Sequence, residues 1–194
     1  MSDNLPRRTS RTSQRLPDAQ PPLYCSFELE PIRAAPRPIF GQYPRNFLRC
    51  VLPLLRSTAS QVLHLCSGAL RPGNGIRVDL RQDARPDVRA DARCLPIRDA
   101  CISAILIDPP YTRTYARRLY GVDYPAPAHL LREAARVLRP GGRVAILHYL
   151  APHPQAGLRL LHIYGVTQGP GYAMRSLTLY EKRQPTLPLP EEEP

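Results

Sequence analysis

The chain has 194 residues, a formal net charge of +11 and a hydrophobic fraction of 43%, which together predict one globular domain with a sizeable core. It contains no run of about 18 apolar residues and no apolar stretch behind its N-terminal arginines, so we expect neither a membrane span nor a secretory signal. The five cysteines are scattered without paired spacing, which argues against a disulfide framework and a metal site and favours a reducing, cytoplasmic compartment.

Composition divides the chain into three parts. Residues 1–22 are rich in Arg, Pro and Ser and residues 185–194 in Pro and Glu, and neither segment has the periodicity of a packed element. We therefore predict a disordered basic tail, one domain over residues 23–184, and a second disordered tail. The excess positive charge falls on the domain, which favours a polyanionic partner such as nucleic acid. A GC-rich genome, which inflates arginine everywhere, is the alternative explanation.

The domain is expected to begin with a helix and a strand. Apolar residues recur at helical spacing from Phe47 to Leu55, and Pro53 should shorten this helix. Residues 61–66 predict a buried strand. Ser67 and Gly68 follow it at once, and a glycine at this point lets the backbone approach a ligand closely.

The link to the next predicted strand is short. Nine residues, Ser67 to Gly75, separate the first strand from the strand over residues 76–79. A parallel crossover with its helix needs about a dozen residues or more, so we predict that the first crossover helix is missing or reduced. The N-terminal segment, or a second subunit such as the other half of a homodimer, would then cover this face of the sheet.

An acidic residue stands at the end of each of three predicted strands. Asp79 ends the second strand, Asp91 ends a short strand over residues 86–91, and Asp108 follows the apolar run Ala104–Ile107. In an open α/β sheet the ligand lies at the carboxyl ends of the strands. The three acids therefore predict one binding site along this edge.

The third acid opens the motif Asp108-Pro109-Pro110-Tyr111. The prolines donate no backbone hydrogen bonds and stiffen the turn, which leaves the Asp108 carboxylate and the Pro109 carbonyl as acceptors beside an aromatic ring. Two acceptors can hold both hydrogens of an aromatic amine and aim its lone pair at an alkyl donor, while Tyr111 stacks on the ring. The plainer alternative is a turn that only ends a core strand.

Arginines and tyrosines alternate in the segment after this turn. They suit the phosphates and bases of a nucleic acid, although an exposed helix with an ordinary polar face is the alternative. The candidate substrate-binding residues are Arg113, Tyr115, Arg117, Arg118 and Tyr120.

The last third of the chain predicts a helix and three strands. Residues 127–138 form the helix, Pro140-Gly141-Gly142 ends it, and residues 143–149 form a buried strand. Two final strands, 157–166 and 176–180, are joined by a turn-rich hairpin. Tyr172 and Arg175 on that connection are candidates for reaching the substrate, whereas we interpret His148 and Tyr149 mainly as packing residues.

The motif at Asp108 resembles the catalytic motif of the S-adenosylmethionine-dependent amino-methyltransferases, and the resemblance covers residues 43–183. It is greatest to the small phage-type adenine-specific DNA methyltransferases. The resemblance implies an α/β, Rossmann-like methyltransferase sandwich with a mostly parallel seven-stranded sheet and an antiparallel last strand. It also implies S-adenosylmethionine as the cofactor and an exocyclic nucleobase amine, most of all that of adenine in DNA, as the methyl acceptor.

The resemblance assigns roles to the residues at the predicted edge. Ser67 and Gly68 would cradle the methionine part of the cofactor, Asp79 its ribose hydroxyls, and Asp91 with the Ala92 amide its adenine. Asp108 would face both the cofactor and the substrate amine, in a catalytic turn with Pro109, Pro110 and Tyr111. The chain departs from the family pattern because it keeps only one glycine of a G-x-G pair.

Three alternatives stay open. One is an RNA amino-methyltransferase acting on adenine or guanine. A second is methylation of a glutamine amide in a protein, which is disfavoured because those enzymes have asparagine where this chain has Asp108. The third is a degenerate domain that binds nucleic acid or another subunit without turnover. Methylation at carbon 5 of cytosine is excluded, because it needs a Pro-Cys pair and none occurs here.

Overall fold

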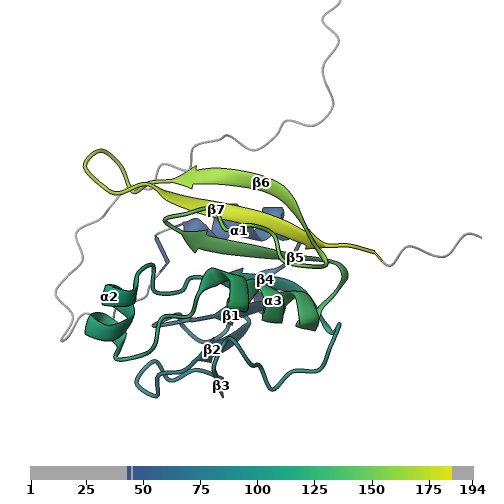
Figure 1. Cartoon of the computed structure of the whole chain (residues 1–194), viewed down its shortest axis with the longest axis horizontal. Coiled ribbons are helices and arrows are strands. Elements are labelled where there is room, and N and C mark those ends of the chain that lie inside the picture. Colours follow the sequence, from purple (N-terminus) through teal and green to yellow (C-terminus); the bar gives the residue numbers. More distant parts are fainter. Residues whose placement is uncertain (1–42, 45, 185–194) are drawn as a thin grey trace, which may run out of the picture.

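The computed structural model describes residues 43, 44 and 46–184, and the predicted tails and residues 23–42 lie outside this range. Seven strands form one sheet in the order β3-β2-β1-β4-β5-β7-β6 (Figure 1). The strands are β1 Val62–Leu65, β2 Ile76–Asp79, β3 Val88–Arg89, β4 Ile102–Ile107, β5 Leu138–His148, β6 Leu158–Val166 and β7 Arg175–Lys182. Strands β1 to β5 pair in parallel, and β7 pairs antiparallel with β5 and β6. The predicted mostly parallel sheet with an antiparallel last strand is confirmed.

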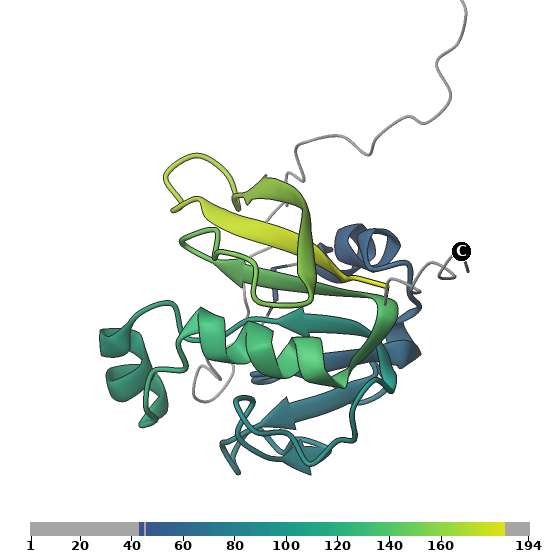
Figure 2. The same cartoon turned by 45° about the vertical axis from the view of Figure 1, so that its right-hand side comes forward.

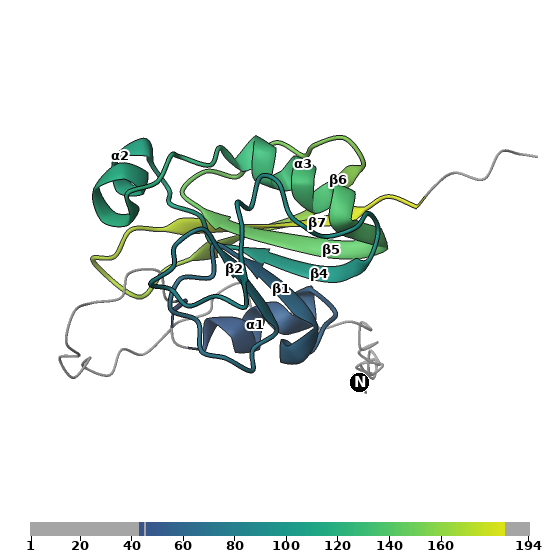
Figure 3. The same ribbon diagram turned by 90° about the horizontal axis from the view of Figure 1, so that it is seen from below.

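Two helices cover opposite faces of this sheet (Figure 3). They are α1 Phe47–Leu54 and α3 Pro127–Val137, and the chain also contains the short turns η1 Ala59–Gln61, α2 Arg113–Tyr115 and the π-helical η2 Ala116–Tyr120. Side chains alternate along β4, so Ala104 and Leu106 pack against the α1 side while Ile105 and Ile107 pack against the α3 side. All four are fully buried, as a strand in the middle of a parallel sheet should be.

Strand β5 begins earlier than the sequence predicts. Leu138 already pairs with Ile102, so the segment Pro140-Gly141-Gly142 belongs to the strand and does not form a separate turn. A register shift lies between Ile102 and Ala104 on the neighbouring strand. At Gly142 a Cβ atom would lie 2.9 Å from the Arg139 carbonyl oxygen and 3.1 Å from the Ser103 carbonyl oxygen, so a larger residue would require the backbone to shift.

The connection from β1 to β2 contains no helix, as predicted. Arg77 on β2 replaces part of the missing packing, because its guanidinium forms a two-pronged ion pair with Asp87 and donates to the Leu70 carbonyl in the connection. The connection also touches the start of β1, since a Cβ atom on Gly75 would lie 2.1 Å from the Val62 carbonyl oxygen. A short loop fixed by one arginine and one glycine therefore stands where a crossover helix would lie.

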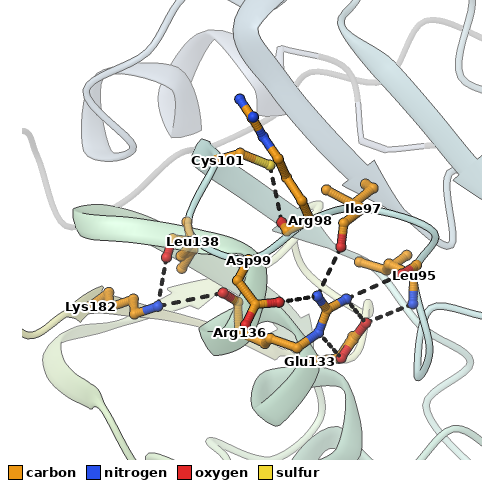
Figure 4. A network of polar contacts seen from close by, with 9 residues as sticks. All are labelled: Leu95, Ile97, Arg98, Asp99, Cys101, Glu133, Arg136, Leu138 and Lys182. Carbon is orange, nitrogen blue, oxygen red and sulfur yellow. Dashed lines mark hydrogen bonds and ion pairs between the residues drawn. The ribbon is translucent and has the colours of Figure 1, made fainter.

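The loop between β3 and β4 is tied to helix α3 by Arg136 (Figure 4). The guanidinium donates to Glu133 on the same helix, to Asp99, and to the carbonyl oxygens of Leu95 and Ile97. Glu133 in turn accepts from the Leu95 amide at 2.6 Å. The network fixes the loop that starts at the carboxyl end of β3.

Two segments extend beyond the carboxyl ends of the parallel strands. The helical turns α2 and η2 follow β4, and the β6–β7 connection lies at the same end of the sheet (Figure 2). They flank the edge at which the sequence predicts the binding site. Within the part of the chain that the structure describes, no helix is both long enough and apolar enough to cross a bilayer.

Candidate active site

The carboxyl ends of β1, β2, β3 and β4 border one pocket. Its lining includes Gly68, Asp79, Asp91, Ala92 and Asp108. These are five of the six residues that the sequence predicted to contact the cofactor. The sixth, Ser67, is buried beside them, and its Oγ has no hydrogen-bond partner within the described residues.

Asp79 holds the loop that follows β1. Its Oδ2 accepts from the Gly68 amide and its Oδ1 from the Arg81 amide, both at 2.9 Å. A carboxylate oxygen has more than one acceptor position, so both oxygens can still take a further hydrogen bond from the pocket side. The position suits the predicted ribose site, and the bond to Gly68 joins that site to the loop.

Asp91 is already paired with a cation. Arg93 binds its carboxylate through Nε and Nη2, at 2.9 and 2.6 Å, and also through its own backbone amide. The side-chain hydrogen bond from Arg93 lowers the pKa of Asp91, so the carboxylate is firmly ionised. Both residues line the pocket, so a ligand at this point meets an aspartate whose oxygens are partly occupied.

Cys66 adopts a backbone conformation that is typical of glycine. It lies between β1 and Gly68 with φ of 56°, in the left-handed region that glycine adopts without strain and other residues rarely enter. Its side chain lines the pocket among the three acids. Burial raises the pKa of the thiol, and Asp79 and Asp108 add to the shift, so Cys66 is a neutral thiol and not a reactive thiolate.

Asp108 belongs to a chain of three polar groups. The Tyr111 hydroxyl donates to Asp108 Oδ1 at 2.6 Å, and Arg175 on β7 donates through Nη1 to the same hydroxyl oxygen at 3.2 Å. Burial raises the pKa of Asp108 to about 6, although the bond from Tyr111 and the charge of Arg175 lower it in part. The carboxylate is therefore ionised at neutral pH within a partly buried turn.

The Tyr111 ring lies in an aromatic group beside the pocket. Its centroid is 4.8 Å from that of Tyr149 and 5.7 Å from that of His148, which it meets edge-on. His148 is buried, and its Nε2 is 3.3 Å from the Tyr124 hydroxyl. Tyr111 is not part of the pocket lining, whereas Pro110 is. Tyr149 is 38% exposed, so it extends the aromatic surface outward from Tyr111.

The five predicted substrate residues divide into two groups. Arg113, Tyr115, Arg117 and Arg118 are exposed on α2 and η2 outside the pocket. Tyr120 instead lines the pocket, where the Arg81 guanidinium lies 5.3 Å from its ring centroid. The structure thus brings Tyr120 to the acids of β2 to β4 and leaves the other four on the surface.

Several residues of the site lacked a clear signal in the sequence. Tyr149 directly follows β5, and only its place at a strand end indicated in the sequence that it could lie near the site. Arg81 and Arg93 each lie two residues after a pocket aspartate, and such arginines are too common in this chain to be singled out. Arg175 was a candidate for reaching the substrate, but it lies 64 residues from Tyr111 and no local pattern indicates that pair.

Tyr43 precedes α1 and packs against this helix and against β1. Its ring stacks on Phe47 with a centroid separation of 5.4 Å, and its hydroxyl is 3.1 Å from His64 Nδ1. Burial raises the pKa of Tyr43, and the Asp108 carboxylate adds to the shift. Tyr43 is therefore a packing residue between α1 and β1.

Comparison with known proteins gives structural likeness only. No protein-family model and no curated protein matches the chain. Among solved structures, TrmN from Thermus thermophilus is 25% identical, with a TM-score of 0.53 over 74% of this chain and 50% of that one. The chain therefore spans half the length of TrmN.

Two further structures share the fold at lower identity. A methyltransferase from Bacillus halodurans C-125 is 15% identical, with a TM-score of 0.51 over 72% of this chain and 100% of that one. The 1,6-didemethyltoxoflavin-N1-methyltransferase of Burkholderia thailandensis, solved with S-adenosylhomocysteine, is 16% identical, with a TM-score of 0.50 over 72% and 78% of the two chains. The fold is that of the Rossmann-like methyltransferases, as the sequence predicted.

Proposed function

We propose that the chain transfers a methyl group from S-adenosylmethionine to an exocyclic amine of a nucleobase. The observation that supports this most is that Asp108 lines the same pocket as Gly68, Asp79 and Asp91. An acceptor for an amine and the three positions expected to hold the methyl donor thus meet at one edge of the sheet. The fold alone does not define a reaction, so the proposal rests on this group of residues.

The residues of the pocket fit this cofactor. Asp79 has acceptor positions left for two ribose hydroxyls, and the unpartnered Ser67 Oγ lies beside the loop assigned to the methionine part. The loop after β1 lacks the helix N-terminus that a dinucleotide pyrophosphate would need, and S-adenosylmethionine carries no phosphate. The S-adenosylhomocysteine bound in the structure of the 1,6-didemethyltoxoflavin-N1-methyltransferase supports the same cofactor. When bound, S-adenosylmethionine supplies an electrophilic methyl group.

The catalytic turn would act by orientation and charge. Asp108 and the Pro109 carbonyl each accept one hydrogen of the amine, which turns the nitrogen lone pair toward the methyl group. The ionised carboxylate also stabilises the positive charge that develops on that nitrogen. No strong base is needed beforehand, since the methylated ammonium is acidic and loses its proton afterwards. Pro110 keeps the turn stiff, and the Tyr111 ring offers a face for the base.

The surface around the pocket suits a nucleic acid. Arg113, Arg117 and Arg118 on α2 and η2 can bind phosphates, and the exposed rings of Tyr115 and Tyr149 lie on the same side as the catalytic turn. For a duplex substrate, the base must leave the stack to reach Asp108. Tyr120 has a different role in this proposal, because it lines the cofactor pocket.

The sequence resemblance favours adenine in DNA, and RNA is the alternative acceptor that the sequence leaves open. The test is methyl incorporation by the full chain from labelled S-adenosylmethionine into duplex DNA, single-stranded DNA and structured RNA, followed by digestion to nucleosides. Methylated amine on a purine supports the proposal, and label in RNA alone would make it an RNA enzyme. Cofactor binding without label in any nucleic acid would contradict the nucleobase assignment.

A second candidate has support from two observations. The Asp91 carboxylate is paired with Arg93, and the loop after β1 keeps only one glycine of the family's pair. Both favour a domain that binds nucleic acid without turnover. Calorimetry with S-adenosylhomocysteine separates the candidates, because an intact protein that binds none of it at millimolar concentration fits the degenerate domain.

A further inference from the structure

The Tyr111 hydroxyl lies between one donor and one acceptor. A phenol carries a single proton, and its oxygen accepts from Arg175 at 3.2 Å. Because a guanidinium can only donate, the phenol proton must point elsewhere, and Asp108 Oδ1 lies 2.6 Å away to receive it. The direction of both hydrogen bonds is therefore determined by the chemistry of Arg175.

We propose that Arg175 is a positioning residue that acts on Asp108 through the Tyr111 hydroxyl. With Oδ1 occupied by Tyr111, the carboxylate is held in one orientation and Oδ2 remains for the substrate amine. This inference rests on the proposed function for its meaning in catalysis. The hydrogen-bond chain itself can be tested without any methyl transfer.

The position of Arg175 in the fold supports this role. It is the first residue of β7, it pairs with Val166 on β6, and β7 lies between two antiparallel partners. A side chain on a paired strand is held more precisely than one on a free loop. The arginine thus reaches Tyr111 from an element distant in sequence but rigid in the sheet.

Several other groups face Asp108 and must be considered with Arg175. They are the Tyr43 hydroxyl from the segment before α1, the Cys66 thiol after β1, and Tyr120 on η2. Burial raises the pKa of each, so all three are neutral at physiological pH. The hydrogen bond from Tyr111 and the charge of Arg175 both lower the pKa of Asp108 against the effect of burial, so both favour the ionised carboxylate.

The first test follows Asp108 directly. In the full chain with ¹³C-labelled aspartate carboxyl carbons, the Asp108 resonance is the one that disappears in Asp108→Asn. Its titration midpoint should rise by about one pH unit in Arg175→Gln, since a neighbouring cation lowers a carboxyl pKa by about that much or more. The control is Arg183→Gln, an exposed arginine just beyond the other end of β7, which should leave the midpoint unchanged.

A double-substitution cycle tests the path through the hydroxyl. Arg175→Gln should shift the Asp108 midpoint less when Tyr111 is already Phe, because only the direct effect of the guanidinium charge is left once the connecting oxygen is gone. Unfolding midpoints of all variants establish that they are folded. An unchanged Asp108 midpoint in folded Arg175→Gln overturns the proposal, and so does an equal shift in the Tyr111 and Phe backgrounds.

Methyl transfer supplies the catalytic readout. The acidic limb of the kcat/KM profile should move to higher pH in Arg175→Gln, with an unchanged KM for S-adenosylmethionine. A shifted NMR midpoint with an unshifted rate profile would overturn the positioning role. The NMR shift can also be observed when neither the wild type nor any variant transfers methyl groups. In that case the hydrogen-bond chain stands and the proposed function fails instead.

Discussion

The carboxylate of Asp79 accepts the backbone amide of Gly68 at 2.9 Å, so the acid at the end of β2 holds the loop at the end of β1. This bond links the ends of two neighbouring parallel strands, whose register is set by the pairing of Leu65 with Val78. One residue thereby shapes the loop assigned to the methionine part of the cofactor and faces the site assigned to its ribose. This double role makes Asp79 the first residue to test.

Substituting Asp79 by Ala should weaken binding of S-adenosylhomocysteine by about 1–3 kcal/mol, because hydrogen bonds to a charged group are lost and the Gly68 amide loses its partner. Asp79→Asn should be nearly as severe, since its amide keeps one acceptor oxygen where two backbone amides now donate. Calorimetric titration measures both. Gln82→Ala, at an exposed side chain on the same loop, is the control and should bind normally. Normal affinity in a folded Asp79→Ala would remove Asp79 from the cofactor site.

Cys66→Gly should stabilise the protein by about 0.5–1 kcal/mol, because the left-handed backbone at φ of 56° costs a non-glycine residue about 1–2 kcal/mol and glycine regains most of it. Chemical unfolding measures the change. Ala100→Gly provides a matched comparison, as Ala100 has φ of 52° and lies outside the pocket. Both should stabilise the fold, and only Cys66→Gly should alter cofactor affinity. Destabilisation by Cys66→Gly alone would mean that the thiol is worth more in packing than the backbone strain costs.

Removing the Arg136 side chain should destabilise the fold by about 1–2 kcal/mol. This is less than the loss of the same hydrogen bonds in a fully buried site would cost, because the guanidinium is partly exposed. Its loss leaves the carbonyl oxygens of Leu95 and Ile97 without this donor and frees the loop that starts near Ala92. Urea unfolding of Arg136→Ala measures the cost. Arg132→Ala, on an exposed position of the same helix, should change stability by less than about 0.5 kcal/mol.

The sequence predicted the parts of the fold that depend on local patterns. Apolar runs and strand-end acids placed Asp79, Asp91 and Asp108 at one edge, and the short link before Gly75 predicted the missing helix. Contacts between distant side chains carry no such pattern, which is why the Arg175–Tyr111 bond was unforeseen. The predicted start of β5 was wrong for a related reason. Pro140-Gly141-Gly142 has the residues of a turn, and its place in a strand depends on pairing with β4, which is not visible in the local sequence. The loss of one glycine was visible, but not that Cys66 adopts the glycine conformation.

Asp108 should make stability fall as pH rises. Its pKa is raised from 3.8 to about 6 in the folded state, so the folded protein holds a proton that the unfolded chain has released between these values. Stability from this group is greatest below pH about 4 and is lost as pH rises through about 6. Asp108→Asn should therefore be more stable than the wild type at pH 7, by about 1–2 kcal/mol after discounting for partial exposure. Unfolding curves measured at about pH 4.5 and pH 7 should show a smaller stability difference between Asp108→Asn and the wild type at the lower pH.

The same carboxylate should separate chemistry from cofactor binding. Asp108→Ala should abolish methyl transfer, because one of the two acceptors that orient the amine is gone, while binding of S-adenosylhomocysteine changes little. Asp108→Asn keeps an acceptor oxygen but not the charge, so transfer should fall by about 10²-fold or more and lose its acidic limb near pH 6. Single-turnover assays with saturating cofactor measure both rates. Wild-type turnover in Asp108→Ala would show that other groups orient the methyl acceptor. An equal loss of methyl transfer and of cofactor binding would show that Asp108 contacts the methyl donor and not the amine.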